Sequence, residues 1–186
     1  SQCPAPLAQI GEALGPETIS DAFAAWGLSH TPQFALPTVS SAYNPTSVNA
    51  AEESIGQGSL LITPLQAVRM IATLANDGER VALHLIEEPS TGCDIEEADD
   101  TRQIITAENA ARLIDILPRY DRSIGLVEHA LAGSDRVQNW FLGLNSERVP
   151  RYAVAVLISQ EKPSNEVIQI GEMLLEQVTK DPTTHP

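Results

Sequence analysis

Ser159 and Lys162, in the run SQEK, form the only serine–lysine pair with a three-residue spacing. A serine hydroxyl becomes a nucleophile when a neighbouring base takes its proton, and on a helix this spacing places the amine beside the hydroxyl. Here the pair follows the apolar run YAVAVLI and precedes Pro163, which indicates the end of a buried strand. We therefore interpret SQEK as a chance match without a chemical role.

The other groups with chemical potential are scattered along the chain. The histidines show no metal-ligand spacing with one another or with the cysteines, so the sequence predicts no metal site. They are His30, His84, His129 and His185. The acidic run EEADD, residues 96–100, could bind a cation, but we interpret it as a solvated loop. We expect neither a metal nor another cofactor.

The two cysteines, Cys3 and Cys93, leave the redox compartment open. They fit one disulfide in an exported protein or two inert thiols, and we favour the thiols.

Composition predicts one compact globular domain over residues 1–186, because 42% of the residues are hydrophobic. Acidic residues outnumber basic ones by 25 to 11, which gives a net charge of −14 and argues against nucleic acid or anionic lipid as a partner. No apolar run reaches the roughly 18 residues of a membrane span. We expect no membrane span here and an export signal, if one exists, outside this chain.

The first half of the chain predicts helices around a long loop. One helix is expected over residues 4–14 and a second from Pro16 to Gly27, with Gly15 between them. Residues 29–49 are rich in Pro, Ser, Thr and Asn and predict a surface loop. Thr63 and Pro64 then begin a helix whose expected buried face consists of Leu65, Val68, Ile71, Ala72 and Ala75.

The middle of the chain predicts two strands and a helix. Residues 79–88 (ERVALHLIEE) and the short run RQII, residues 102–105, have strand composition. Thr106 to Leu117 predicts a capped helix. Its expected apolar positions are Ala107, Ala111, Leu113, Ile114 and Leu117.

The last third predicts a hairpin followed by a helix. Residues 137–144 and 151–159 are rich in β-formers, and the polar turn NSERVP separates them. Within the first run we expect at least one of Trp140 and Phe141 to lie in the core. Ser164 caps a closing helix with an expected packing stripe at Val167, Ile170, Leu174 and Val178. Together these elements predict an α+β fold, an antiparallel sheet with flanking helices.

Three segments carry a family resemblance. The first combines IGQG (residues 55–58), TPLQ (63–66) and LANDG (74–78), and the second is QNWFLGLNSERVPRYAVAVLI (138–158). With the upstream helices of residues 3–28, they resemble the C-terminal portion of a penicillin-binding protein transpeptidase domain. The resemblance implies a β-lactamase/transpeptidase-like fold that is incomplete at its N-terminal side. It also implies serine acyl transfer by three motifs: SxxK, SxN and KTG or KSG.

This chain departs from those motifs. The SxN position falls on Ser1, Gln2 and Cys3, so the asparagine is replaced by cysteine. The lysine motif aligns with Ser134, Asp135 and Arg136 in one register and with Leu126, Val127 and Glu128 in a second, gapless register. Neither register keeps the lysine, and either acidic residue would repel a substrate carboxylate. The tripeptide SVN, residues 47–49, matches SxN in type but lies too close to IGQG, and we interpret it as loop polarity.

Three hypotheses follow from these observations. The chain is a transpeptidase-like module of peptidoglycan synthesis that is inactive as given and serves a binding or structural role. Alternatively, it is a truncated piece of an active D,D-transpeptidase whose SxxK segment lies upstream, with a cation such as Arg136 replacing the lysine. The third hypothesis is an unrelated α+β binding domain.

The resemblance also implies a location and partners. We expect the protein to be extracytoplasmic, exported or anchored through a segment outside this chain. Its expected partners are a peptidoglycan peptide or another cell-wall protein, and an exposed sheet edge predicts self-association or a partner. We further expect the segment around Gln57 and the hairpin of Trp140 to line one former acylation pocket.

Overall fold

The computed structural model describes residues 3–32, 36–39, 42–44, 48–84, 101–132 and 135–180. By backbone contacts the chain divides into two compact units, Ser1–Gln66 with Val81–Arg102, and Ala67–Arg80 with Gln103–Pro186. We describe each unit by itself. The expectation of one domain over residues 1–186 stays a prediction.

In the first unit, α1 (Ala5–Ala25) is interrupted where the sequence predicted a break. Gly15 has φ 81° and ψ 164°, and Pro16 follows it, so two helical halves meet at a kink. Gly11 is buried, and a glycine is needed there because a β-carbon would lie 2.3 Å from the carbonyl oxygen of Ala50. The two predicted helices are therefore confirmed.

A short helix, α2 (Ala50–Ser54), was not predicted. Asn49 caps it, with its side-chain oxygen accepting hydrogen bonds from the amides of Ala51 and Glu52 at 3.2 and 3.4 Å. The signal was present in the sequence, since asparagine followed three residues later by glutamate is typical of a helix start.

The helix predicted after Thr63 is confirmed as α3 (Pro64–Ala75), and the hydroxyl of Thr63 accepts from the amide of Gln66 at 3.2 Å. Its most buried side chains differ from the expected apolar face. They are Gln66, Ala67, Arg69, Ile71 and Thr73. A polar side chain can be buried when it forms a hydrogen bond with a backbone group. The hydroxyl of Thr73, for example, donates to the carbonyl of Arg69 at 2.8 Å.

The prediction of a strand over residues 79–88 is wrong for residues 79–84, which are the part that the structure describes. Only Glu79 pairs, in an isolated bridge with Gln103, and residues 80–84 have no regular structure. Residues 85–88 lie outside the described residues, as does the acidic run 96–100. The turn before the bridge explains the difference: Gly78, at φ 78°, accepts hydrogen bonds from the amides of residues 104 and 105, so a turn takes the place of a ladder.

In the second unit, α4 (Ala107–Ile116) confirms the helix predicted after Thr106, whose hydroxyl accepts from the amide of Asn109 at 3.3 Å. Ala110 is fully buried on this helix, whereas Ala107 and Ala111 are exposed. The packing face is therefore turned relative to the predicted one.

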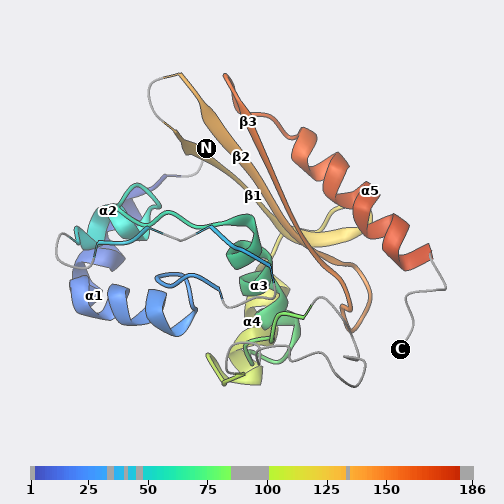
Figure 1. The fold of residues 1–186 in the computed structure, drawn as a ribbon, viewed down its shortest axis with the longest axis horizontal. Helices are drawn as coiled ribbons and strands as arrows, with labels where there is room; N and C mark the ends of the chain where they lie inside the picture. The colour runs from blue at the N-terminus through green and yellow to red at the C-terminus, as the bar shows by residue number, and fades with distance from the viewer. Residues whose placement is uncertain are drawn as a thin grey trace. The chain divides into compact units, whose positions relative to one another are not determined.

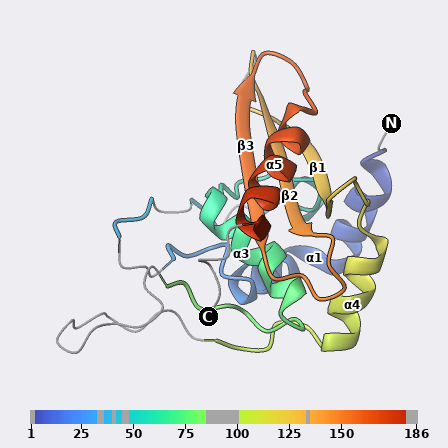
Figure 2. The same ribbon diagram turned by 90° about the vertical axis from the view of Figure 1, so that its right-hand side faces the viewer.

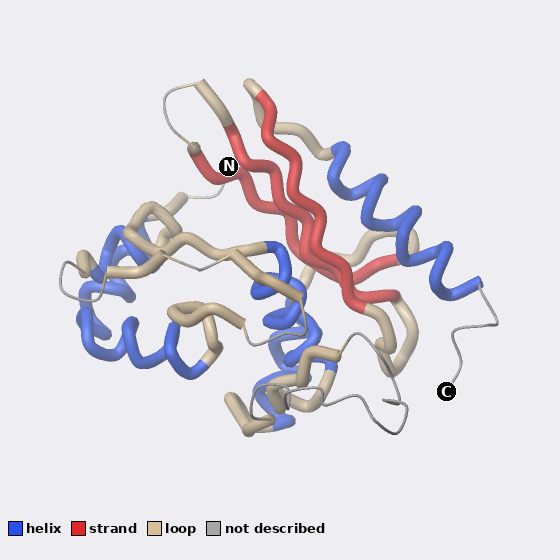
Figure 3. Tube along the Cα trace, in the orientation of Figure 1, coloured by secondary structure: helices blue, strands red, loops and turns tan. Residues whose placement is uncertain are grey.

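The sheet consists of β1 (Ser123–Leu131), β2 (Val137–Asn145) and β3 (Ala153–Gln160), antiparallel throughout and in the order β1-β2-β3 (Figure 3). The predicted hairpin is confirmed as β2 and β3, while β1 was not predicted from its residue pattern. The α+β fold class is confirmed.

Helix α5 (Glu166–Lys180) lies along one face of this sheet, as two perpendicular views show (Figures 1 and 2). Phe141, Val156 and Val167 form the core between them. Phe141 is fully buried and Trp140 half-buried, which confirms the expectation for that pair.

The packing stripe of α5 differs from the predicted one. Val167, Gly171 and Leu175 are buried, whereas Leu174 and Val178 are 40% and 37% exposed. A glycine fits the stripe because a β-carbon at Gly171 would lie 2.2 Å from the Cδ1 atom of Phe141. The helix approaches the sheet closely at this point.

Polar contacts join the middle of α5 to the start of β1. The carboxylate of Glu172 accepts hydrogen bonds from the amide of Arg122 at 2.8 Å and from the hydroxyl of Ser123 at 3.1 Å. Tyr120 packs edge-on against Phe141, with ring centroids 5.8 Å apart. Burial, together with the negative charge of Glu172, raises the pKa of the Tyr120 phenol above its ordinary value.

We predict that Gly171→Ala destabilises the fold. The added methyl group must displace Phe141 or α5, a cost of about 1–3 kcal/mol that exceeds the gain of at most ~1 kcal/mol in helix propensity. Denaturant unfolding should show a net loss of about 1–2 kcal/mol, and Gln169→Ala on the exposed side of α5 should show none. Equal stability of Gly171→Ala and the unchanged protein would contradict this packing.

The phenol of Tyr120 predicts a loss of stability at high pH. Because its pKa is raised in the folded state, the folded protein holds this proton more tightly than the unfolded chain, and stability falls as the pH rises above the ordinary value of 10.0. Tyr120→Phe keeps the ring and removes the proton. The free energy of unfolding, measured from pH 9 to pH 11, should decrease less with pH for Tyr120→Phe than for Tyr152→Phe, which is the matched control.

Candidate functional site

The sheet has two edge strands, β1 and β3, and one of the two registers predicted for the lysine motif falls on β1. Near its start the edge is covered, because the amide of Gly125 donates to the carbonyl of Pro118 at 3.0 Å and the amide of Tyr120 donates to Ser123 at 2.8 Å. Backbone groups of an antiparallel strand alternate in direction, so Val127 and His129 also turn their N–H and C=O groups outward. In the described part of the chain, no backbone hydrogen bond is made on the outer side of residues 127–131.

The two registers predicted for the lysine motif fall in different places. Leu126, Val127 and Glu128 lie on β1 itself, whereas Asp135 and Arg136 are exposed in the connection between β1 and β2. Ser134 lies outside the described residues. Which register corresponds to the family motif stays a prediction.

The predicted SxN position lies in the other unit. Cys3 is exposed with a free thiol just before α1, and Ser1 and Gln2 lie outside the described residues, as does Cys93. Because Cys3 and the Gln57 segment belong to the first unit and Trp140 to the second, the expectation of one shared pocket stays a prediction.

A buried amide holds β1 in place from behind. Asn139 of β2 is fully buried, and its side-chain oxygen accepts from the amide of Ser164 at 2.8 Å. The same oxygen contacts Nδ1 of His129 at 2.7 Å, so that ring nitrogen carries the proton and donates it. The Nδ2 group of Asn139 lies 3.3–3.4 Å from the carbonyl oxygens of Val137, Ile158 and Lys162. This arrangement fixes the His129 ring against the sheet.

On the opposite face, Glu128, Trp140 and Leu157 form a row across the three strands, because each is the cross-strand partner of the next. Glu128 is exposed, and its carboxylate makes no ion pair or hydrogen bond with the described residues. The row therefore presents one free negative charge at the sheet edge, next to an indole ring.

The IGQG segment of the first unit is a turn closed by a buried carboxylate. Glu53 is 6% exposed, and its Oε1 atom accepts from the amide and the hydroxyl of Ser59 at 2.7 and 2.8 Å. A β-carbon at Gly58 would lie 2.1 Å from the carboxyl carbon of Glu53, and Gly56 has φ 70°. The close approach of Glu53 requires a glycine at position 58, and the positive φ favours one at position 56.

The TPLQ segment has a comparable structural role within the same unit. The Nε2 group of Gln66 lies 3.0–3.1 Å from the carbonyl oxygens of Gly27, Leu28 and His30, and its Oε1 atom accepts from the amide of Thr63 at 2.9 Å. Gln66 thereby joins the first turn of α3 to the residues that follow α1.

The chance matches are explained by their surroundings. Ser159 lies in β3 and Lys162 in the turn after it, so the predicted place of SQEK at the end of a strand is confirmed, and the pair does not lie on the helix that SxxK requires. Asn49 of the SVN run caps α2, and Ser47 lies outside the described residues. Among the described residues, no group of three or more potential metal ligands gathers, and no helix is long and apolar enough to cross a membrane.

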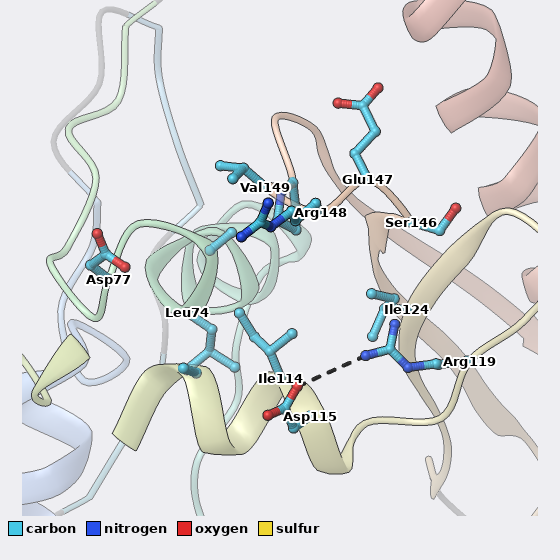
Figure 4. A pocket seen from close by; sticks show the side chains of 13 residues that line it. Leu74, Asp77, Ile114, Asp115, Arg119, Ile124, Ser146, Glu147, Arg148 and Val149 are labelled. Atoms are coloured by element: carbon cyan, nitrogen blue, oxygen red, sulfur yellow. Dashed lines mark ion pairs between the residues drawn. The ribbon is translucent and has the colours of Figure 1, made fainter. Parts of the chain in front are cut away.

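The second unit also contains a cavity of about 410 Å³ between the end of α3, α4 and the turn that joins β2 to β3 (Figure 4). Apolar side chains such as Leu74 and Ile114 line it, and Arg119 reaches toward Asp115 at 3.9 Å. The residues aligned with the SxN and lysine motifs do not line this cavity, whereas Leu74 and Asp77 of the LANDG segment do, and Ile124 of β1 contributes to its wall.

Taken together, the antiparallel sheet and its flanking helices define an α+β fold. The family model for the penicillin binding protein transpeptidase domain matches residues 3–180. The chain belongs to this family, which excludes the hypothesis of an unrelated α+β domain.

Similar proteins and solved structures belong to the same family, and they are longer than this chain. The peptidoglycan D,D-transpeptidase PbpA of Mycolicibacterium smegmatis is 26% identical over 181 residues, with 84% of this chain and 36% of that protein covered. An imipenem acyl-enzyme structure of penicillin-binding protein A from M. tuberculosis aligns with a TM-score of 0.80 at 22% identity, over 96% of this chain and 45% of that one. Penicillin-binding protein 2B of Streptococcus pneumoniae aligns at 0.61 and 17% identity, over 92% and 34%. This chain therefore spans about a third of the length of the curated relative.

Sequence reasoning missed the pairing of His129 with Asn139. Ten residues separate them, and no local pattern links a histidine on one strand to an amide on the next. The one available signal was a polar residue at a position of β2 where alternation predicts burial, because such a residue needs hydrogen-bond partners.

We predict that Asn139→Leu destabilises the protein by about 3 kcal/mol or more. The similar-sized apolar side chain leaves the partly buried amide of Ser164, the ring N–H of His129 and the facing carbonyl groups without their partner. Chemical unfolding checks the value. Gln138→Leu, the neighbouring substitution on the other face of β2, is the control and should change stability by less than about 1 kcal/mol. Comparable losses in the two variants would contradict the anchoring role of Asn139.

Proposed function

We propose that this chain is the C-terminal part of a transpeptidase-like module of the cell wall, which binds an extended peptide at the β1 edge and performs no acyl transfer by itself. One observation carries the proposal. The strand whose edge is open contains no lysine, since Lys162 and Lys180 lie after β3 and at the end of α5. We therefore propose that this edge binds a peptide through its backbone and lacks the lysine of the family motif.

The gapless register supports this proposal. The family motif acts from the edge of the sheet, and Leu126, Val127 and Glu128 are the motif candidates that lie on a strand. Glu128 opposes the binding of a substrate carboxylate at this position. We assign the altered motif to these three residues on that ground.

The relatives support the cellular setting. The curated relative is a peptidoglycan D,D-transpeptidase, so we propose an extracytoplasmic location, with export or anchoring supplied outside this chain. A peptidoglycan peptide or another cell-wall protein is the proposed partner. A self-associated form through an open sheet edge is the alternative.

A second candidate function is that of an active enzyme of which this chain is one piece. The short coverage of the relative, 36%, favours it, because an SxxK helix could lie in the remaining part. In that case Arg136 or another cation would have to replace the missing lysine.

Labelling with a fluorescent penicillin separates the two functions. We predict that the full-length gene product, incubated with saturating probe, gives no covalently labelled band, because acylation needs a serine activated by a base and a cation for the carboxylate. An active penicillin-binding protein on the same gel serves as the control for the probe. A labelled band that unlabelled penicillin competes away would overturn the inactive-module proposal and support the active enzyme.

A further inference from the structure

We infer that the β1 edge selects an extended peptide that carries a lysine-type amine, with Glu128 as the group that selects it. This inference rests on the proposed function, namely that the edge binds a peptide. It adds the charge of the ligand and the face of the sheet on which that charge lies.

The first step is the backbone. Val127, His129 and Leu131 direct their N–H and C=O groups away from β2, and no described residue pairs with them on that side. A strand edge of this kind binds an added strand through main-chain hydrogen bonds, while side-chain contacts set the specificity. The anchored ring of His129 keeps this stretch of the edge in place.

The second step is the charge. Glu128 is the only formally charged side chain of β1, and no basic residue occurs on β2 or β3. The nearest charges along the chain lie beyond the two ends of the strand, Asp121 and Arg122 before it and Asp135 and Arg136 after it. An ammonium group placed next to Glu128 would gain a partner, whereas a carboxylate would be repelled.

The third step is the apolar surface beside that charge. Trp140 is the cross-strand partner of Glu128 on the same face, and Leu157 follows it on β3. An indole ring accommodates the aliphatic stem of a lysine-type side chain and attracts its ammonium group. Charge and aromatic contact therefore favour the same ligand group.

A second copy of this chain fits the edge less well. Each copy has a net charge of −14, so two copies repel each other at low salt. The antiparallel register that places Val127 opposite His129 of the other copy also brings the two Glu128 side chains face to face, which destabilises the pair. A basic peptide meets neither obstacle.

Fluorescence anisotropy with three matched peptides tests the inference. The peptides are blocked pentamers of alternating valine and threonine whose central residue is lysine, norleucine or glutamate. At low salt we expect the lysine peptide to bind about fivefold more tightly than the norleucine peptide, and the glutamate peptide to bind most weakly. Glu128→Gln should remove this preference and Glu128→Lys should reverse it, while Glu161→Gln, the control with the same change in net charge, should keep it.

A further variant distinguishes failure of the inference from failure of the proposed function. Leu131→Pro removes an outward N–H without losing a bond to β2, so it should weaken all three peptides equally. Equal affinities that Leu131→Pro lowers would overturn the amine selection and leave peptide binding at the edge intact. Absence of binding by all three peptides would overturn the proposed edge binding and the inference with it.

Discussion

Backbone groups that are buried need hydrogen-bond partners, and in this chain buried side-chain amides supply several of them. Gln66 satisfies the carbonyls that follow α1, and Asn139 joins β2 to the start of α5. Asn145 accepts from the amides of residues 151 and 152 at 2.9 Å and so closes the turn between β2 and β3. Gln66 and Asn145 lie where the chain changes direction, whereas Asn139 lies within β2 and contacts the residues that lead into α5. The positions of the helices and strands within each unit therefore depend on a few polar side chains as much as on the apolar core.

The same constraint separates what the sequence predicted from what it did not. Helix starts at Thr63 and Thr106, the kink at Gly15 and the β2–β3 hairpin follow from local rules of capping, turn formation and alternation, and those predictions were confirmed. The wrong face of α5 was predicted to be buried, because a pattern of apolar residues does not include Gly171. This glycine is buried where the helix packs closely against the ring of Phe141. Such a choice depends on a residue some thirty positions away, and a single sequence does not report it.

The candidate site shows a similar division. The motif positions could be aligned by type and order, which placed Leu126–Glu128 and residues 134–136 as alternatives. Their location on a strand or in a connection depends on pairing between β1 and β2, which is a non-local property. β1 itself escaped prediction because polar residues interrupt its apolar pattern at Glu128 and His129. Those two residues are also the ones that distinguish this edge chemically.

Alternation along the strands explains how a family fold can persist while its charged groups change. His129 and Asn139 are cross-strand partners and point to the α5 side, where their hydrogen bonds hold the sheet to the helix. Glu128 and Trp140 are the adjacent pair and point to the other side, where the carboxylate of Glu128 makes no ion pair or hydrogen bond with the described part of the protein. Substitution on the second face can therefore alter the ligand without loss of the contacts that stabilise the first. An exposed charge such as that of Glu128 can change on this face at little cost to folding, because surface charges contribute little to stability. The strand period of two thus separates the residues that hold the fold from those that select what it binds.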